Sequence, residues 1–381
     1  MTSSYDTIVV GAGIEGSATA MYLAIKGSRT LLLEQFELEH TRGSSHGGSR
    51  IIRYNYPESF YVEMMKKAYP LWSDIEKQAG VKLVEKCGGI TFGHRDHVEI
   101  RNGIESLSRE NIPHSVIESD EIQKRYPFLN LPDDFVVVAE PDSGYVYARK
   151  SLKAMQKIFV SNGGTILDMH KVVGITPGRI IRVKTLKGSF QCKSLIICAG
   201  PWTNNVLTDT GLKLPITPHR VCISFYKQTD SAFDNIPIFI YRAQNDPGFH
   251  YYGMPDSEYP GLFKICAHNG VALSNPDDRD TNSDYSFLEY TTNFIASKLR
   301  GVSSKPSILE TCIYTLAPDH NPFLDRHPHF HNIVIGAGFS GHGFKLAPVV
   351  GSILSGLALH EEIDYDISHF KISRFKSNSK L

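Results

Sequence analysis

A glycine-rich turn near the start of the chain has the spacing needed to bind phosphate groups. Gly11, Gly13 and Gly16 follow the β-branched run of residues 5–10 and precede a stretch compatible with a helix to about residue 26. The first glycine permits a tight turn, the second lets the backbone approach a pyrophosphate, and the third allows the helix to pack closely on a sheet. The helix N-terminus then offers unpaired N–H groups to the phosphates. The turn therefore predicts a dinucleotide site.

The carboxylate of Glu34 supplies the second half of this pattern. It ends the continuously apolar run of residues 30–33, which we expect to be a buried parallel strand, with Gly27 ending the helix before it. An acid in this place accepts hydrogen bonds from the adenosine ribose and disfavours a 2′-phosphate. Strand, glycine turn, helix, strand and acid in this order are far more specific than the glycines alone. The pattern leaves NAD and FAD as alternatives.

A loop rich in cations follows this βαβ unit. Residues 40–53 combine glycine and serine with two histidines and three arginines. Such a loop suits an extended cofactor and an anionic substrate better than it suits a hydrophobic core. The alternative is a solvated basic loop with no ligand.

Length and charge exclude several other classes of protein. The chain has 381 residues, with 40 Lys plus Arg against 40 Asp plus Glu, so its formal net charge is zero. This removes the attraction that nucleic acids and anionic membranes require. No uncharged apolar run reaches the roughly 18 residues of a membrane span. The six cysteines form no CxxC pair and no zinc spacing, so we expect reduced thiols, no metal site and a small-molecule partner.

Elements remote in the sequence are expected to join one sheet. The apolar runs of residues 194–200 and 332–338 both end in glycine, as the first strand does. The stretches of residues 86–144 and 216–304 show more alternation and more turn residues, which favours an antiparallel sheet. The sequence thus predicts an α/β fold with a second, α+β domain built on a largely antiparallel sheet. The expected division is a discontinuous, Rossmann-like dinucleotide domain of residues 1–85, 145–215 and 305–381, and a substrate domain of residues 86–144 and 216–304.

The glycine turn and four later motifs resemble a known flavoprotein family. The later motifs are residues 43–53, 199–202, 312–315 and 338–345. In this order they are similar to monomeric sarcosine oxidase, N-methyltryptophan oxidase and the peroxisomal sarcosine and pipecolate oxidases, within the D-amino-acid-oxidase-like flavoproteins. The resemblance covers nearly the whole chain and implies FAD, a D-amino-acid-oxidase or glutathione-reductase type of FAD-binding domain, and a monomer.

The resemblance implies that the FAD is covalent, through a thioether between Cys312 and the flavin 8α-methyl. Without the resemblance, the residue type alone would indicate that Cys312 is an inert buried thiol. The thiolate is the nucleophile, so nearby positive charge would favour the linkage. One departure is that Ser45-His46 stands where bacterial sarcosine oxidases commonly have two adjacent histidines. The implied cofactor-binding residues are Gly11, Gly13, Gly16, Glu34, Ser44, Ser45, His46, Arg50, Val172, Cys312, Gly341 and Lys345.

The resemblance also assigns residues to the substrate. Arg53 and Lys345 would bind its carboxylate, and Lys264 would favour electron transfer to oxygen on the opposite flavin face. The alternatives are surface ion pairs for the first two and an outward-facing strand residue for Lys264. Three further residues would shape the pocket, namely Tyr252, His268 and Tyr314. His268 could act as a base, but we expect the cationic surroundings to remove the ammonium proton on binding.

The expected reaction is the oxidation of a small secondary amino acid, such as sarcosine, L-pipecolate or L-proline. A hydride equivalent passes from the carbon beside nitrogen to flavin N5, in one step or two, and O2 then yields H2O2 and leaves an imine product. The alternatives are an FAD-dependent dehydrogenase with another electron acceptor and a non-catalytic nucleotide-binding protein. The final tripeptide, residues 379–381, is Ser-Lys-Leu, which the peroxisomal import receptor reads at a C-terminus. We therefore expect a peroxisomal enzyme.

Overall fold

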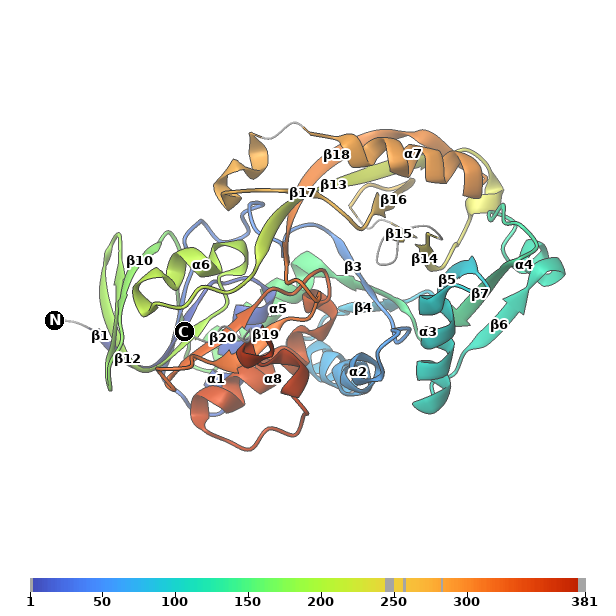
Figure 1. The fold of residues 1–381 in the computed structure, drawn as a ribbon. Coiled ribbons are helices and arrows are strands. Elements are labelled where there is room, and N and C mark those ends of the chain that lie inside the picture. Colours follow the sequence, from blue (N-terminus) through green and yellow to red (C-terminus); the bar gives the residue numbers. More distant parts are fainter. Residues whose placement is uncertain (1–2, 244–249, 256–257, 282–283, 376–381) are drawn as a thin grey trace.

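The computed structural model describes residues 3–243, 250–255, 258–281 and 284–375. Two large sheets lie at opposite ends of an elongated molecule, with helices packed against both (Figure 1). This arrangement confirms the predicted α/β fold with a second, largely antiparallel sheet. In the part of the chain described, no helix is both long enough and apolar enough to cross a membrane.

The first sheet is the predicted dinucleotide-binding sheet. Its six-strand path runs β10-β11-β12-β1-β2-β9, and β20, which pairs with β12, carries β19. The pairs β1–β2, β1–β12, β2–β9 and β12–β20 are parallel, so strands from remote parts of the sequence do join one sheet. The strands are β1 (Ser3–Val10), β2 (Thr30–Leu33), β9 (Thr165–Leu167), β10 (Val172–Thr176), β11 (Ile181–Thr185), β12 (Gly188–Ile197), β19 (Phe323–Arg326) and β20 (Ile333–Ala337).

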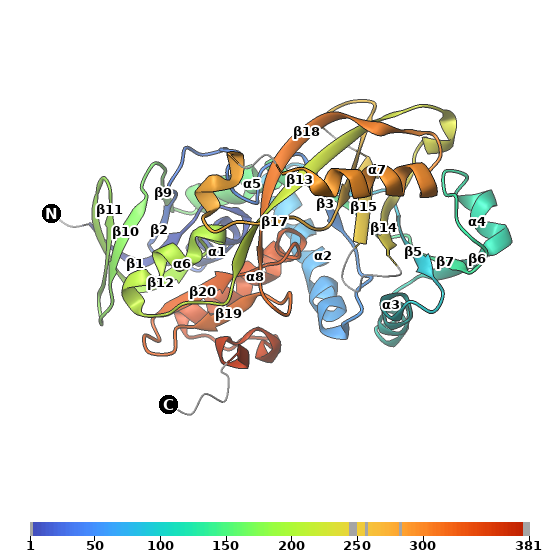
Figure 2. The same ribbon diagram turned by 45° about the horizontal axis from the view of Figure 1, so that its top comes forward.

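Apolar helices cover this sheet and bring distant glycine turns together. Helix α1 (Ile14–Ile25) follows the first turn and packs against α8 (Gly343–Leu359), which follows the last. A Cβ atom at Gly351 would lie 2.7 Å from the backbone carbon of Ala18, so the two helices meet backbone to backbone. The two helices therefore lie side by side (Figure 1 and Figure 2). The other helices here are α2 (Ser59–Ala79), α5 (Ala148–Ser161) and α6 (Thr203–Val206).

The second sheet has nine strands in the order β17-β13-β16-β15-β14-β5-β7-β6, with β18 paired to β13. Every pairing in it is antiparallel except β14–β5. Its strands are β5 (Gly89–His94), β6 (Ser115–Glu118), β7 (Phe135–Glu140), β13 (Thr217–Gln228), β14 (Ile238–Arg242), β15 (His250–Pro255), β16 (Leu262–Ala267), β17 (Val271–Ala272) and β18 (Val302–Leu316). Strand β18 runs across the domain boundary expected at residue 305.

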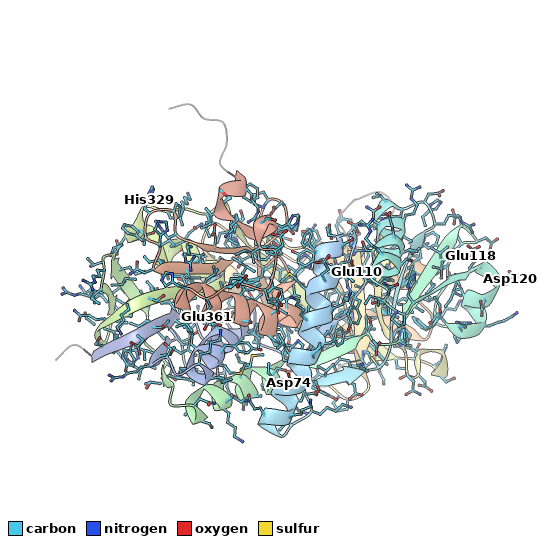
Figure 3. The ribbon with its side chains drawn as sticks, turned by 90° about the horizontal axis from the view of Figure 1, so that it is seen from below. Asp74, Glu110, Glu118, Asp120, His329 and Glu361 are labelled. Atoms are coloured by element: carbon cyan, nitrogen blue, oxygen red, sulfur yellow. The ribbon has the colours of Figure 1, made fainter. Side chains whose placement is uncertain are left out.

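Smaller elements join the two sheets. A three-stranded sheet contains β3 (Ser49–Ile52), β8 (Gly144–Tyr147) and β4 (Val84–Lys86). Helix α3 (Val98–Arg109) contacts α2, and Glu110 at its end is 3.1 Å from Lys66 on α2 (Figure 3). Helices α4 (Ser119–Arg125) and α7 (Ser286–Lys298) flank the nine-stranded sheet.

Candidate cofactor and active site

One cavity extends from the glycine turn after β1 to the face of the nine-stranded sheet. Its wall includes residues from both sheets and from the loop of residues 43–50. Every residue that the sequence assigned to the cofactor or the substrate lines this cavity except Gly16, which lies beneath the turn. The assigned residues, spread from position 11 to position 345, thus converge on one place.

The glycine turn has the geometry of a phosphate cradle. Gly11 has φ +101°, and a Cβ atom there would lie 2.3 Å from the carbonyl oxygen of Cys198. A Cβ atom at Gly16 would lie 1.9 Å from the carbonyl oxygen of Gly11, so only glycine lets α1 start here. At Gly13 the nearest atom to such a Cβ is Ser45 Oγ, at 3.1 Å. The turn therefore presents bare backbone to the cavity, as a bound pyrophosphate needs.

Glu34 holds this turn against the end of β2. One of its carboxylate oxygens accepts a hydrogen bond from the backbone of Ala12 at 2.9 Å. The other accepts from the backbones of Gln35 and Phe36 at 2.8 and 3.1 Å. Glu34 is buried and lines the cavity, so it fixes the geometry of the cradle in addition to the ribose contact expected of it.

The serines of the cation-rich loop attach it to helix α1 and to strand β18. Ser45 Oγ accepts a hydrogen bond from the backbone N–H of Ile14 at 3.0 Å, at the start of α1. Ser44 Oγ donates to the carbonyl oxygen of Ile313 at 2.5 Å, on β18. The Sγ atom of Cys312 is 3.9 Å from the carbonyl oxygen of Ser44, and the thiol is buried beside the cavity. The loop thus connects the glycine turn to Cys312.

Arg50 and His46 stiffen the same loop in different ways. The Arg50 guanidinium donates to the carbonyl oxygens of Ser44 at 2.9 Å and of Ser49 at 2.8 Å. His46 Nδ1 lies 2.7 Å from the carbonyl oxygen of Gly43. Burial, aided by the charge of Arg50, lowers the pKa of His46 to about 4, so its ring is neutral at ordinary pH.

Two cations meet at the substrate end of the cavity. Arg53 and Lys345 are only 5% and 8% exposed, which rules out surface ion pairs. The Arg53 guanidinium lies 4.2 Å from the ring centre of Tyr56, and among the described residues its Nη1 has no hydrogen-bond partner. The Lys345 Nζ atom is 3.5 Å from the carbonyl oxygen of Gly341. Burial, then the charges of Arg53 and Arg50, lower the pKa of Lys345 to about 7. Such a pair is suited to an anionic ligand.

Lys264 occupies a separate part of the wall. It lies on β16 and is 4% exposed, so the alternative of an outward-facing strand residue is wrong. Its Nζ atom donates to the carbonyl oxygen of Ser49 at 3.4 Å and lies 5.8 Å from the ring centre of Phe225. The cation is therefore fixed at the end of the loop of residues 43–50.

Aromatic residues form the remaining wall. The His268 ring stacks on His250 with centroids 4.2 Å apart, and the Tyr314 hydroxyl is 3.3 Å from His268 Nδ1. Burial and the charge of Lys345 lower the pKa of His268 to about 3, so it is neutral near pH 7. Tyr252 meets His268 edge to face at 6.3 Å. A Cβ atom at Gly341, which has φ +84°, would lie 2.4 Å from the His268 ring. Gly341 therefore allows the last glycine turn to pack against these rings.

Several residues in the wall carried no signal in the sequence. Tyr56 lies beneath Arg53, and its hydroxyl is 3.3 Å from His342 Nδ1. Arg242, at the end of β14, forms a buried ion pair of 2.8 Å with Glu99. Each of these side chains reaches the cavity from a different element, so no local pattern could single it out. Among the described residues, no group of histidine, cysteine or carboxylate side chains could hold a metal ion.

The parallel sheet, its glycine cradle and a buried cationic cavity beside an antiparallel sheet together define a dinucleotide-dependent oxidoreductase. Comparison with known proteins makes this specific. The chain belongs to the family described as "FAD dependent oxidoreductase", which matches residues 6–357.

Two curated relatives and one solved structure illustrate the similarity. The peroxisomal sarcosine oxidase of Homo sapiens is 41% identical over 99% of this chain and 97% of its own length. The monomeric sarcosine oxidase of Arthrobacter is 32% identical over 97% of this chain and 96% of its own length. The structure of NikD, described as an unusual amino acid oxidase, superimposes with a TM-score of 0.86 at 25% identity, covering 97% of this chain and 98% of NikD. The fold class and the family expected from the sequence are thus confirmed.

Proposed function

We propose that this chain is an FAD-dependent oxidase of small secondary amino acids, with sarcosine, L-pipecolate and L-proline as candidate substrates. The observation that carries the proposal is the pair of buried cations, Arg53 and Lys345, in the cavity that also contains the glycine cradle. Buried like charges are costly unless an anion joins them, and an amino acid carboxylate is such an anion. The similarity to sarcosine oxidases over nearly the whole chain points to the same substrate class.

The described residues fit FAD as the cofactor. The bare backbone at Gly13 and the carboxylate of Glu34 suit a pyrophosphate and an adenosine ribose. Val172, at the start of β10, lines the same cavity. Cys312 would carry the 8α-thioether, since it is buried beside the cavity at the far end of the loop that starts from the cradle. The chemistry that this cofactor would supply is the acceptance of a hydride equivalent from the carbon beside nitrogen and the transfer of its electrons to O2.

The protein's part in the reaction is to hold the substrate and set its protonation. Arg53 grips the carboxylate through parallel N–H bonds, while Lys345 adds a point charge. These cations lower the pKa of the substrate ammonium, which then loses its proton on binding. Burial lowers the pKa of His268 to about 3, so its ring is too weak a base to take this proton, and with its hydrogen bond to Tyr314 it orients the substrate instead. Lys264 supplies the fixed positive charge that favours electron transfer to O2 over a dehydrogenase reaction.

Two experiments test the proposal. After acid precipitation the protein should stay yellow, and Cys312→Ser should release its flavin, whereas Cys222→Ser, at a half-buried thiol on the neighbouring strand β13, should retain it. A peroxide-release assay with sarcosine, L-pipecolate and L-proline should give activity with at least one. Slow flavin reoxidation without peroxide would instead support a dehydrogenase, and a colourless protein would remove the cofactor assignment.

The proposal extends to location and assembly. Residues 379–381 lie outside the described residues, but their sequence is the one read by the peroxisomal import receptor. Two mammalian relatives are named peroxisomal, and a product such as H2O2 suits that compartment. The relatives named monomeric sarcosine oxidase support a monomer.

A further inference from the structure

The middle of the glycine turn carries an acidic residue that the proposed reaction does not use. Glu15 lies between Gly13 and Gly16, in the first turn of α1, and its side chain lines the cofactor cavity. A Cβ atom at Gly343 would lie 2.2 Å from Glu15 Oε1. The carboxyl group therefore covers the first residue of α8 and stands between the N-termini of the two helices that face the cavity.

Few charged side chains near Glu15 balance a negative charge. Burial raises the pKa of Glu15 to about 7, and this effect outweighs the hydrogen bond from its own backbone N–H and the charge of Arg50, which both oppose it. Arg50 is already engaged with the carbonyl oxygens of its own loop. Directly after β12 the neighbouring group is the Cys198 thiol, whose pKa is raised by burial and by the charge of Glu15. At the start of α8 the titratable groups are His342, which precedes the helix and which burial keeps neutral, and Lys345, whose own pKa is lowered.

A bound dinucleotide makes ionised Glu15 still less favourable. Its pyrophosphate carries negative charge and lies at the N-terminus of α1, in the same turn as Glu15. Reduced flavin adds further negative charge. Like charges in a buried site disfavour each other, whereas a protonated carboxyl can donate a hydrogen bond to a phosphate, ribityl or flavin oxygen.

We propose that Glu15 is uncharged when FAD is bound, that its carboxyl donates a hydrogen bond to the cofactor, and that FAD binding takes up a proton above neutral pH. The inference rests on FAD being the cofactor. It makes cofactor binding, as distinct from turnover, sensitive to pH through one residue of the glycine turn. Glu15 would thus act as a hydrogen-bond donor, whereas the neighbouring Glu34 acts as an acceptor.

The test compares Cys312→Ser with Cys312→Ser/Glu15→Gln, since removing the thiol makes FAD binding reversible. FAD is titrated into each full-length apoprotein by fluorescence at pH 6.5 and 8.5. With a Glu15 pKa of about 7, the Kd of the first protein should rise about 25-fold between these pH values through Glu15. In the double variant the glutamine keeps a hydrogen-bond donor and cannot ionise. The rise in the Kd for FAD between the two pH values should therefore be smaller by a factor of about 25. Contributions from Lys345 are common to both proteins and cancel in the comparison.

Equal pH dependence in the two proteins would overturn the inference. Calorimetry of FAD binding in two buffers at pH 8.5 gives a second readout: uptake of about one proton more by Cys312→Ser than by the double variant supports the inference, and equal uptake overturns it. The failure of this inference can be distinguished from the failure of the proposed function. Absence of FAD binding in both proteins would remove the proposed function as well, whereas equal profiles with tight FAD binding would remove only the role of Glu15.

Discussion

At the scale of single residues, the site is defined by cations that are buried before any ligand arrives. Arg53, Lys264 and Lys345 are each at least nine-tenths buried. Removing a charged side chain from water costs several kcal/mol, so proteins rarely bury such a group without an oppositely charged partner. The pair Arg53 and Lys345, which meet at one end of the cavity, is therefore better explained by an anionic ligand than by stability.

Lys345 should make carboxylate binding weaken with pH. Its pKa is lowered to about 7, so the cation is present below that pH and is lost as the pH rises above it. The inhibition constant of cyclohexanecarboxylate, which has no amine to titrate, should rise by up to about tenfold per pH unit above 7. Lys345→Arg keeps its charge and should flatten this rise. A steep rise that persists in Lys345→Arg would assign the titration to another group.

His268 should contribute through its shape and hydrogen bond to Tyr314. Because its pKa is near 3, it cannot be the group behind any loss of kcat/KM between pH 6 and 8. We expect His268→Asn to lower kcat/KM by less than the roughly 100-fold that loss of a general base costs, without changing the pH profile. Steady-state kinetics between pH 6 and 8 provides the measurement. If the fall of kcat/KM at low pH disappeared in the variant, His268 would be shown to accept a proton.

At the scale of elements, glycines place the helix N-termini at the cavity. Gly11→Ala would put a Cβ atom 2.3 Å from the backbone oxygen of Cys198, at φ +101°. We expect it to lower the free energy of unfolding by about 3 kcal/mol or more and to abolish FAD binding. Gly163→Ala is the matched control, since its φ is +86° but nothing lies within 4 Å. It should cost only about 1–2 kcal/mol and keep the flavin. Thermal unfolding and flavin content measure both.

The ion pair of Arg242 and Glu99 connects β14 to α3 at the cavity wall. At 2.8 Å, with Arg242 buried, it is a pair whose disruption leaves one charge unbalanced. We expect Arg242→Met to lower the free energy of unfolding by about 3–5 kcal/mol, and Arg242→Met/Glu99→Gln to recover part of that loss. Chemical denaturation of the variants provides the measurement. A double variant no more stable than the single one would mean that the pair is not the source of the effect.

At the scale of the whole molecule, the proposed peroxisomal location can be tested at the C-terminal tripeptide. Deleting Leu381 should redistribute a tagged protein from peroxisomes to the cytosol, because the import receptor reads a free Ser-Lys-Leu end. Fluorescence microscopy against a peroxisomal marker gives the result. The tag must be at the N-terminus, and replacing the half-buried Cys222 by serine provides a control that should leave the distribution unchanged. A punctate pattern after the deletion would contradict the assignment.

The sequence by itself determined the parts of this protein that depend on local order. Strand, glycine turn, helix, strand and Glu34 follow one another within 34 residues, and Gly16 is required by a contact inside that unit, with the carbonyl oxygen of Gly11. The strands of residues 333–337 and 194–197 could also be predicted, since a buried parallel strand is a continuous apolar run. The family followed from motifs that keep their order along the chain.

Only the tertiary structure decided which single side chains share the cavity. Tyr56, His342, Arg242 and Glu99 come from different elements, and no spacing relates them. The sequence could not tell a buried Lys264 from an outward-facing one, because a strand alternates sides and only packing fixes which side is covered. The raised pKa of Glu15 likewise comes from burial in the folded molecule, since residues 15 and 343 become neighbours only when the chain folds.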